Sequence, residues 1–308
     1  MTEELSYTIE EVAKLLKVSK LTVYDLVKKG QLPIFRVGRQ MRMDAKDLER
    51  YILQNKSHPS ASQDRPSPKL EQARPLHKVI SGQDMALDIL GKQIEKQSSY
   101  KVLRSYTGSL NSLISMYSGE CDIVSLHLFD GETGEYNLPY VKKILVSRPY
   151  LLIRLISRLA GLFVPEGNPM NISSWEDLKR KDITIMNREK GSGARVLLDE
   201  QLRIHGISSS AIQGYDQEES SHLSVASAIS NGHANLGVGI EKAARIVGVD
   251  FIPLITEQYD LVILKSPENE ELIETVKRIL TSPSFQAEIQ SLGGYDLTQT
   301  GKVLHETF

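Results

Sequence analysis

Residues 8–52 read TIEEVAKLLKVSKLTVYDLVKKGQLPIFRVGRQMRMDAKDLERYI, and this stretch decides the fold of the N-terminal part of the chain. Thr8 and Glu11 have the spacing of a capping box, and apolar residues with helical spacing follow them. Ser19 can cap a second helix over residues 20–29. Two short helices joined by a tight turn predict a helix-turn-helix, whose second helix typically enters the major groove of DNA.

The second half of this stretch predicts a hairpin and a closing helix. IFRVG (34–38) and MRM (41–43) are two short strand patterns around a turn that contains glycine, which favours a β-hairpin, or wing. Asp44 can cap a final helix, AKDLERYI. We therefore expect a small winged domain over residues 1–54.

The stretch resembles the winged helix-turn-helix of the excisionase/MerR-like family. The S-x-x-T-V-Y start of the second helix and the L-P-x-x-R-V-G of the wing carry the resemblance. It implies that the DNA-facing residues are Ser19, Lys20, Thr22, Tyr24 and Lys28 on the helix, with Arg36, Arg39 and Arg42 on the wing. Residues on the helix would read base edges, whereas the wing would reach phosphate or the minor groove. For any one of these residues, a solvated basic face is the alternative.

The charges of the chain are split between a basic head and an acidic body. Residues 1–78 contain 15 Lys and Arg against 10 Asp and Glu, whereas the other 230 residues contain 22 against 29. This split suggests that only the head meets double-stranded DNA. Because so small a domain should bind weakly alone, we expect a homodimer on two half-sites.

Length and composition limit the classes of protein to which the chain can belong. With 308 residues, the chain is long enough for two or three domains. Its single cysteine, Cys121, excludes a disulfide framework and a multi-cysteine metal site. No apolar run reaches the roughly 18–20 residues that cross a bilayer, and the first residues lack a signal-peptide pattern. We therefore expect a cytoplasmic protein with no membrane contact.

Residues 55–75 separate the head from the body. They are rich in Ser, Pro and Gln, and Leu70 is their only large aliphatic residue. Such a stretch buries too little apolar surface to offset its ordering entropy, so we expect a mobile linker. A helix over PKLEQAR (68–74) is the alternative for part of it.

The body, residues 76–308, alternates strand and helix patterns, as in HKVISG (77–82) followed by a helical run. This alternation predicts an α/β fold with largely parallel strands, divided into two lobes. Small polar residues mark three strand-to-helix junctions, at 81–84, 107–109 and 191–193. Helix N-termini there favour an anion, so three junctions together indicate a ligand cleft. For one junction alone, a plain cap and turn is the better interpretation.

The most specific stretches of the body are GSLNSLISMYSGECDIVSLHLFDGETGEYNLPYV (108–141), VPEGNP (164–169), NREKGSGARVLLDEQL (187–202) and SHLSVASAISNGHANLGVGIE (221–241). On these stretches the body resembles the periplasmic-binding-protein-like domain, type II, of the molybdate-binding kind, from about His77 to Gln290. The resemblance implies two lobes that close over a small ligand, with chain crossings near 125–129 and near 236–240. The pocket residues that it implies are Ser81, Gly82, Gln83, Ser109, His127, Asn137, Ser192, Gly193, His222 and Val225.

Two departures from the family pattern leave the ligand open. The chain has Ser-Gly-Gln-Asp at 81–84 where Gly-Ser-His-Asp is expected, and Arg-Leu-Ala-Gly at 158–161 where Arg-x-Gln-Gly is common. A His and a Gln with hydrogen-bonding capacity are thereby lost. The ligand is then either a molybdate-like oxyanion or another small anion, held by helix N-termini, or a polar metabolite.

Other chemistry is less well supported by the sequence. His127 and His222 lack a metal-ligand spacing, and Ser192 in GSGAR does not form a G-x-S-x-G nucleophile turn. Arg188 and Arg195 fit an anionic ligand and a pairing with nearby acids equally well. The acidic loop DGETGE (130–135) lacks the ligand pattern of an EF-hand, so we expect a solvated turn.

The sequence therefore predicts a ligand-responsive, DNA-binding transcriptional regulator, with no cofactor and no enzymatic activity. One alternative is an enzyme that converts the cleft ligand while the head only localises it. The other is an architectural DNA-binding protein of the excisionase type.

Overall fold

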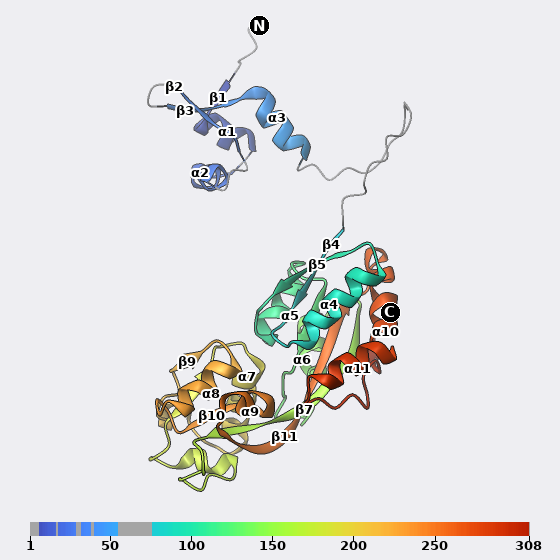
Figure 1. Cartoon of the computed structure of the whole chain (residues 1–308). Coiled ribbons are helices and arrows are strands. Elements are labelled where there is room, and N and C mark those ends of the chain that lie inside the picture. The colour runs from blue at the N-terminus through green and yellow to red at the C-terminus, as the bar shows by residue number, and fades with distance from the viewer. Residues whose placement is uncertain (1–5, 17, 29–31, 38–39, 55–75, 308) are drawn as a thin grey trace. The chain divides into compact units, whose positions relative to one another are not determined.

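The computed structural model describes residues 6–16, 18–28, 32–37, 40–54 and 76–307. The chain divides into two compact units, Met1–Gln72 and Ala73–Phe308, called the N-terminal and the C-terminal unit below (Figure 1). The linker expected over 55–75 lies outside the described residues, and so does Arg39 of the expected wing.

The described elements of the N-terminal unit are β1 (Ser6–Thr8), α1 (Ile9–Leu16), α2 (Lys20–Lys28), β2 (Phe35–Val37), β3 (Gln40–Asp44) and α3 (Ala45–Gln54). The predicted capping box opens α1, because Thr8 N donates to Glu11 Oε2 (2.7 Å) and Glu11 N donates to Thr8 Oγ1 (3.3 Å). The strands β2 and β3 form the predicted hairpin. The sequence did not predict β1, which pairs with β3 and completes a three-stranded sheet in the order β1-β3-β2.

A small apolar core holds these elements together. Its centre consists of Val12 of α1, Val23 of α2, Leu32, Met43 of β3 and Leu48 of α3, all almost fully buried. Both helices of the helix-turn-helix, the hairpin strand β3 and the closing helix α3 thus contribute to one core, which holds α2 and the wing in one unit.

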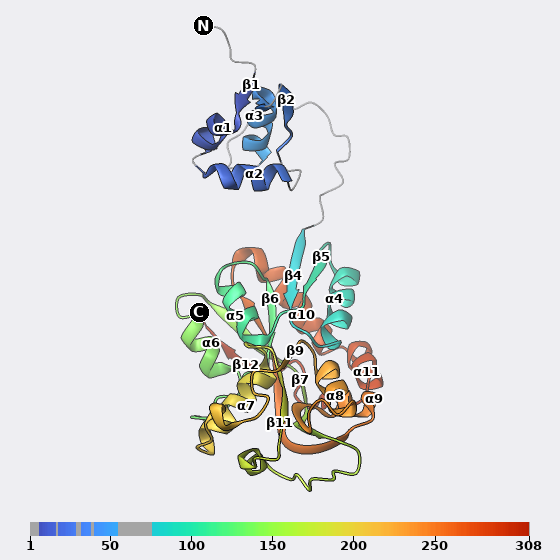
Figure 2. The same ribbon diagram turned by 90° about the vertical axis from the view of Figure 1, so that its left-hand side faces the viewer.

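The C-terminal unit builds one sheet against which helices pack on both sides (Figure 2). Its strands are β4 (His77–Ser81), β5 (Lys101–Ser105), β6 (Ile123–Leu126), β7 (Tyr150–Val164), β8 (Ile185–Arg188), β9 (Glu218–Glu219), β10 (Leu236–Ile240), β11 (Asp250–Leu264) and β12 (Val303–Glu306). Its α-helices are α4 (Ala86–Gln97), α5 (Ser109–Tyr117), α6 (Leu138–Ile144), α7 (Gly193–Ile204), α8 (His222–Ser230), α9 (Glu241–Val247), α10 (Glu270–Leu280) and α11 (Pro283–Ser291). The strand order in the described part is β5-β4-β6-β11-β7-β10-β8-β9, with β12 paired to β7.

The predicted two-lobed α/β fold is confirmed. Lobe 1 consists of β4–β6 with α4, α5, α6, α10 and α11, and lobe 2 consists of β8–β10 with α7, α8 and α9. Figure 1 shows α4, α5 and α10 toward one end of the unit and α7, α8 and α9 toward the other. The strands β7 and β11 serve both lobes. Leu155 of β7 lies in a core of lobe 1, whereas Leu162 lies in a core of lobe 2.

Chain crossings are expected near 125–129 and near 236–240. Near Phe129 the chain contacts a lobe 2 core between β6 and α6, which belong to lobe 1, whereas β10 contributes only to cores of lobe 2. β7 and β11 also pass between the lobes. They have 15 residues each, against 4 in β6 and 5 in β10, so each of them reaches from a core of lobe 1 to a core of lobe 2.

The expectation of largely parallel strands holds for only part of the sheet. The two longest strands, β7 and β11, pair antiparallel, from Tyr150 with Leu264 to Val164 with Asp250. The pairs β4–β5, β4–β6, β8–β10 and β8–β9 are parallel as expected. In the sequence, the polar run TEQYD (256–260) divides β11 into two apolar runs. In the structure its acids Glu257 and Asp260 are buried and paired, so the strand continues through them.

No helix among the described residues is long and apolar enough to cross a membrane.

Candidate functional site

A cavity of about 410 Å³ lies in the C-terminal unit and is lined by residues of both lobes. Its lining consists of Gln83, Asp84, Met85, Tyr106, His127, Arg158, Ser220, Ser221, His222, Leu223, Ile240, Lys242, Ala243, Ile246, Tyr259 and Tyr295. The loops after β4 and β5 supply the lobe 1 wall, while the starts of α8 and α9 supply the lobe 2 wall. This volume is in the range of small-molecule sites.

A buried network of charges forms one wall of the cavity. Arg158 of β7 donates to Glu257 Oε2 through Nε (2.6 Å) and also pairs with Asp84. The other carboxylate oxygen of Glu257 pairs with His127 Nδ1. Although burial raises the pKa of Glu257, the charges of Arg158 and His127 outweigh it and hold that pKa well below its usual range.

Asp84 joins this network to the start of α4. Its Oδ1 accepts from Ala86 N (2.7 Å), so the carboxylate also caps the helix start. Tyr295 Oη donates to both carboxylate oxygens of Asp84, at 3.0 and 3.1 Å. Because Asp84 is satisfied by Arg158, Tyr295 and a backbone amide, it is neutralised within the cavity wall rather than presented to a ligand.

Two side chains of the cavity have buried nitrogen atoms without a hydrogen-bond partner in the described structure, His222 Nδ1 and Lys242 Nζ. Burial, followed by the charges of Arg188 and Arg158, lowers the pKa of His222 well below 6.5. Burial also lowers the pKa of Lys242, against the opposing effect of Asp84. Polar atoms of this kind are rare in folded proteins, so these two are candidate contacts for a ligand or a water molecule.

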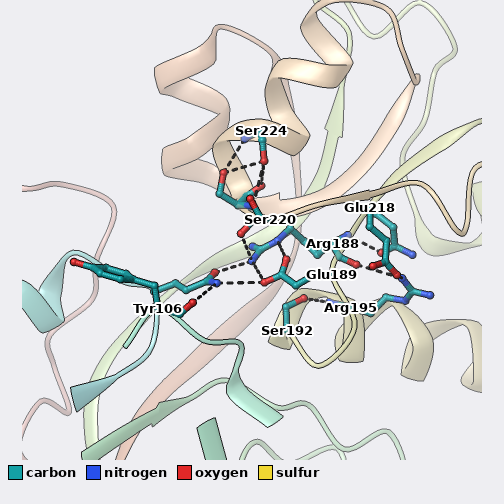
Figure 3. Close-up of polar contacts among 11 residues, drawn as sticks. Tyr106, Arg188, Glu189, Ser192, Arg195, Glu218, Ser220 and Ser224 are labelled. Carbon is teal, nitrogen blue, oxygen red and sulfur yellow. Dashed lines mark hydrogen bonds and ion pairs between the residues drawn. The ribbon is translucent and has the colours of Figure 1, made fainter. Parts of the chain in front are cut away.

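The two lobes contact each other beside the cavity (Figure 3). Arg188 Nη2 donates to Gln83 Oε1 (2.7 Å), and Gln83 Nε2 donates to Glu189 Oε1 (3.2 Å). Leu110 N, at the start of α5, donates to Gly191 O (2.9 Å). These hydrogen bonds join the loop after β4 and the α5 start to the loop after β8, so the described arrangement is a closed one.

Three of the ten predicted pocket residues line the cavity, namely Gln83, His127 and His222. Ser192 instead caps α7 by accepting from Arg195 N (3.3 Å), and Gly193 packs against the ring of His127. Ser192 N donates to Glu189 O within its own loop (3.2 Å), and Leu110 N of α5 donates to Gly191 O of this loop, so both N–H groups already have protein partners.

The other predicted pocket residues lie behind the cavity wall. Ser81 Oγ is hydrogen bonded to Ser112 Oγ (2.8 Å), Gly82 adopts a positive φ beside Ser125, and Val225 belongs to a core of lobe 2. These positions shape the wall but do not line the cavity.

Ser109 and Asn137 also form hydrogen bonds with the backbone of this region. Ser109 Oγ accepts from His127 N (3.3 Å). Asn137 is fully buried, with Oδ1 accepting from Leu128 N (2.7 Å) and Nδ2 donating to Asp260 Oδ2 (2.7 Å). Every polar atom of the Asn137 side chain is therefore used inside the protein, away from the cavity.

Sequence reasoning missed most of the cavity lining. In the sequence, Arg158 belongs only to a departure from a family pattern, and Lys242 and Tyr295 are not among the predicted pocket residues. A strand-to-helix junction is the signal that could find Lys242, because the junction after β10 precedes it. Tyr295 follows α11 in a loop and carries no local signal.

The residues that the sequence offers for other chemistry have structural roles. Arg195 pairs with Asp199 and Glu218, and Arg188 pairs with Glu189, so both follow the acid-pairing interpretation. Asp130 Oδ1 accepts from the backbone N–H of Thr133 (2.9 Å) and closes a turn. Among the residues that the structure describes, no group of three or more His, Cys, Asp or Glu could hold a metal ion.

In the N-terminal unit, α2 presents several of the predicted DNA-contacting residues to solvent. Lys20, Tyr24 and Lys28 are spaced four apart, so they lie on one helix face, and all three are exposed. Val23, on another face of the helix, is fully buried in the core of the unit. Lys20 also forms an ion pair with Glu10 of α1, which reduces the positive charge that it offers.

The other predicted DNA-contacting residues differ in exposure and in their hydrogen-bond partners. Ser19 Oγ accepts from Thr22 N (3.1 Å), so this pair caps α2 at its exposed start. Arg36 of β2 is exposed. Arg42 of β3 is half-buried and donates to Ser6 Oγ (3.0 Å), which ties it to β1.

A helix-turn-helix unit joined to a two-lobed unit with a ligand-sized cavity defines a DNA-binding protein with a ligand-binding domain. Residues 6–56 match the family model of a helix-turn-helix domain, and residues 91–281 match that of the PBP superfamily domain. Because the second match covers more than half of the chain, the chain belongs to the PBP superfamily.

Three relatives illustrate these similarities. The YvgK protein of Bacillus subtilis is 54% identical over 311 residues, which cover 100% of both chains. A Mycobacterium tuberculosis protein described as DNA-binding is 59% identical over 39 residues, 13% of this chain and 50% of that protein. The structure of the tungstate ABC transporter from Geobacter sulfurreducens matches with a TM-score of 0.52 at 13% identity, covering 70% of this chain and 98% of that one. At that identity the match shows the fold alone.

Proposed function

We propose that the protein is a ligand-responsive transcriptional regulator, in which the N-terminal unit binds an operator and the cavity of the C-terminal unit binds an effector. The observation that carries this proposal is the combination, in one chain, of an exposed Lys20–Tyr24–Lys28 face on α2 and a cavity lined by two lobes. The matches to a helix-turn-helix domain and to the PBP superfamily domain support it. We further propose that the head is of the excisionase/MerR-like kind.

Regulation requires that the effector binds one arrangement of the lobes better than another. The hydrogen bonds from Gln83 to Arg188 and Glu189 exist only when the lobes are close. An effector in the cavity contacts both walls and would favour this closed arrangement. We propose that the protein acts as a homodimer on two half-sites, so that lobe closure changes the pairing of the two bodies and the spacing of the two heads.

The test combines an effector screen with DNA binding by the full chain. The thermal stability of the protein is measured with molybdate, tungstate, phosphate, sulfate and a panel of small metabolites. Molybdate and tungstate represent the oxyanions that the family resemblance predicts, and the metabolites represent the alternative.

Any compound that raises the melting temperature is then added to operator titrations over a salt series, with the operator selected from random DNA. A change in operator affinity supports the proposal. Equal affinity with and without the compound at every salt concentration refutes effector control.

A second candidate, an enzyme acting in the same cleft, is favoured by one observation. His127 lines the cavity, and Glu257 pairs with its Nδ1, an arrangement that orients a general base. This candidate predicts conversion of a stabilising compound by the full chain and loss of conversion in His127→Asn. Recovery of the unchanged compound after incubation with the native protein refutes it.

A further inference from the structure

The cavity contains one cation that has neither a carboxylate nor a hydrogen-bond partner among the described residues. Lys242 Nζ, at the start of α9, is shielded from solvent and has no hydrogen-bond partner among the described residues. It lies 4.8 Å from the centroid of the Tyr295 ring. The two arginines beside the cavity differ in this respect, because Arg158 pairs with Asp84 and Glu257 and Arg188 pairs with Glu189.

An unpaired ammonium group that is removed from water is costly to the folded protein. A single anionic group of a ligand would supply the partner that Lys242 lacks, and the desolvated surroundings would strengthen the pair. Arg158 already has two carboxylate partners and Arg188 has one, whereas Lys242 has no hydrogen-bonded carboxylate among the described residues. One such ammonium fits a ligand with one anionic group. The unpartnered His222 Nδ1 offers a further polar contact in the same cavity.

The rest of the cavity lining fits the apolar part of a ligand. Four large apolar side chains on the cavity wall are exposed although the lobes are close, namely Met85 (52% exposed), Tyr106 (65%), Leu223 (45%) and Ile246 (62%). They come from both lobes. A strongly hydrated tetrahedral oxyanion would leave these side chains uncovered, whereas an aromatic or aliphatic body would bury them.

We propose that the cavity binds a small organic monocarboxylate, whose carboxylate pairs with Lys242 and whose aromatic or aliphatic body packs against Met85, Tyr106, Leu223 and Ile246. This inference names the effector class for the cleft site and rests on the proposed regulatory function.

The experiment uses the full chain and defined probes. Benzoate, phenylacetate and hexanoate are titrated beside their neutral amides, and molybdate and phosphate are included as oxyanions. We expect at least one carboxylate to raise the melting temperature in a saturable way, while its amide and both oxyanions do not. Lys242→Met should raise the Kd of that carboxylate at least about tenfold, because a charge-assisted pair is lost.

Two controls separate binding from folding. Lys242→Met replaces a buried, unpartnered ammonium by an apolar side chain of similar length, so without ligand it should melt at the native temperature or above. Lys92→Met makes the same change on the exposed surface of α4 and should keep the native response to the carboxylate. Circular dichroism confirms that both variants are folded.

The outcomes distinguish this inference from the regulatory function. The inference fails if no carboxylate stabilises the protein, if an amide stabilises it equally, or if Lys242→Met responds like the native chain. If molybdate or phosphate stabilises the protein and changes operator affinity, the regulatory function stands and the carboxylate class is refuted. If a carboxylate binds through Lys242 without changing operator affinity, the ligand class stands and the regulatory function is refuted.

Discussion

Arg158 pairs with two buried carboxylates in the cavity wall, so its removal should destabilise the C-terminal unit. In Arg158→Met, Asp84 loses its cation, and Glu257 keeps only His127. Breaking a buried ion pair from one side costs about 3–5 kcal/mol, so we expect a loss of that size in the free energy of unfolding. Urea unfolding followed by the fluorescence of Trp175, the single tryptophan, measures it.

Arg180 provides the matched control for this prediction. It is about one third exposed and pairs with Asp177 and Asp182 at the surface of lobe 2. Arg180→Met should therefore leave the urea unfolding curve close to the native one, because an exposed ion pair contributes little to stability. Equal unfolding curves for the two variants would contradict a structural role for the Arg158 network.

His222 should make the stability of the protein depend on pH in the weakly acidic range. Burial, then the charges of Arg188 and Arg158, lower its pKa well below 6.5, whereas the unfolded chain titrates near that ordinary value. As the pH falls below 6.5, the unfolded state takes up a proton that the folded state does not. The contribution is therefore complete above 6.5 and is lost toward lower pH, with a slope of up to about 1.4 kcal/mol per pH unit.

The variant His222→Gln tests this pH dependence. It should flatten the decrease of the free energy of unfolding between pH 6.5 and about pH 5, measured by urea unfolding at each pH. His233→Gln removes an exposed histidine just after α8 and should follow the native curve. A His222→Gln curve parallel to the native one would contradict the lowered pKa.

At the scale of elements, α2 should carry most of the DNA contact that the described residues provide. Lys28 is exposed at the end of its outward face, without a partner that would offset its charge in the described structure. Lys28→Ala should weaken binding to all DNA sequences and reduce the slope of log affinity against log salt by about one.

Fluorescence anisotropy with operator and random duplexes over a salt series measures this effect. Lys46→Ala, on the exposed surface of α3, is the control and should leave the salt slope unchanged. If Lys46→Ala reduced the slope and Lys28→Ala did not, α3 rather than α2 would be the helix that faces DNA.

The sequence predicted the elements that depend on local interactions. The capping box of Thr8 and Glu11 and the cap of Ser192 on Arg195 join residues three apart, so their pattern can be read along the chain. The sequence does not predict β1, because its three residues, Ser6–Thr8, form a strand only through pairing with β3. Tertiary pairing, not propensity, makes that segment a strand.

The cavity could be predicted only in part, for the same physical reason. Gln83 and His222 lie at strand-to-helix junctions, which are visible in the sequence. The contacts of Asp84 with Tyr295 and of Arg158 with Glu257 join residues 211 and 99 positions apart. No local pattern marks such pairs, because they form only in the folded chain: Arg158 and Glu257 lie opposite each other on β7 and β11, and the loop after α11 brings Tyr295 to the start of α4.

At the scale of the whole molecule, the closed arrangement of the lobes depends on a close approach at Gly108. A Cβ atom at this position would lie 2.8 Å from Gly191 O and 2.9 Å from Ser192 N, backbone atoms of the other lobe. Gly108 itself has φ −65° and ψ 155°, which any residue adopts. Gly108→Ala should therefore leave α5 intact but disfavour closure.

Paired spin labels measure this effect on the lobes. Cysteines replace the exposed Lys92 of lobe 1 and Lys181 of lobe 2, and Cys121 is replaced by serine. Gly108→Ala should move the distance distribution to longer values, while Ser118→Ala, at the exposed end of α5, should not. Because an effector can shift an equilibrium only by its differential affinity, Gly108→Ala should also weaken effector binding and keep operator affinity at its effector-free value. An unchanged distance distribution together with a native operator response would mean that closure of the lobes does not transmit the signal to DNA.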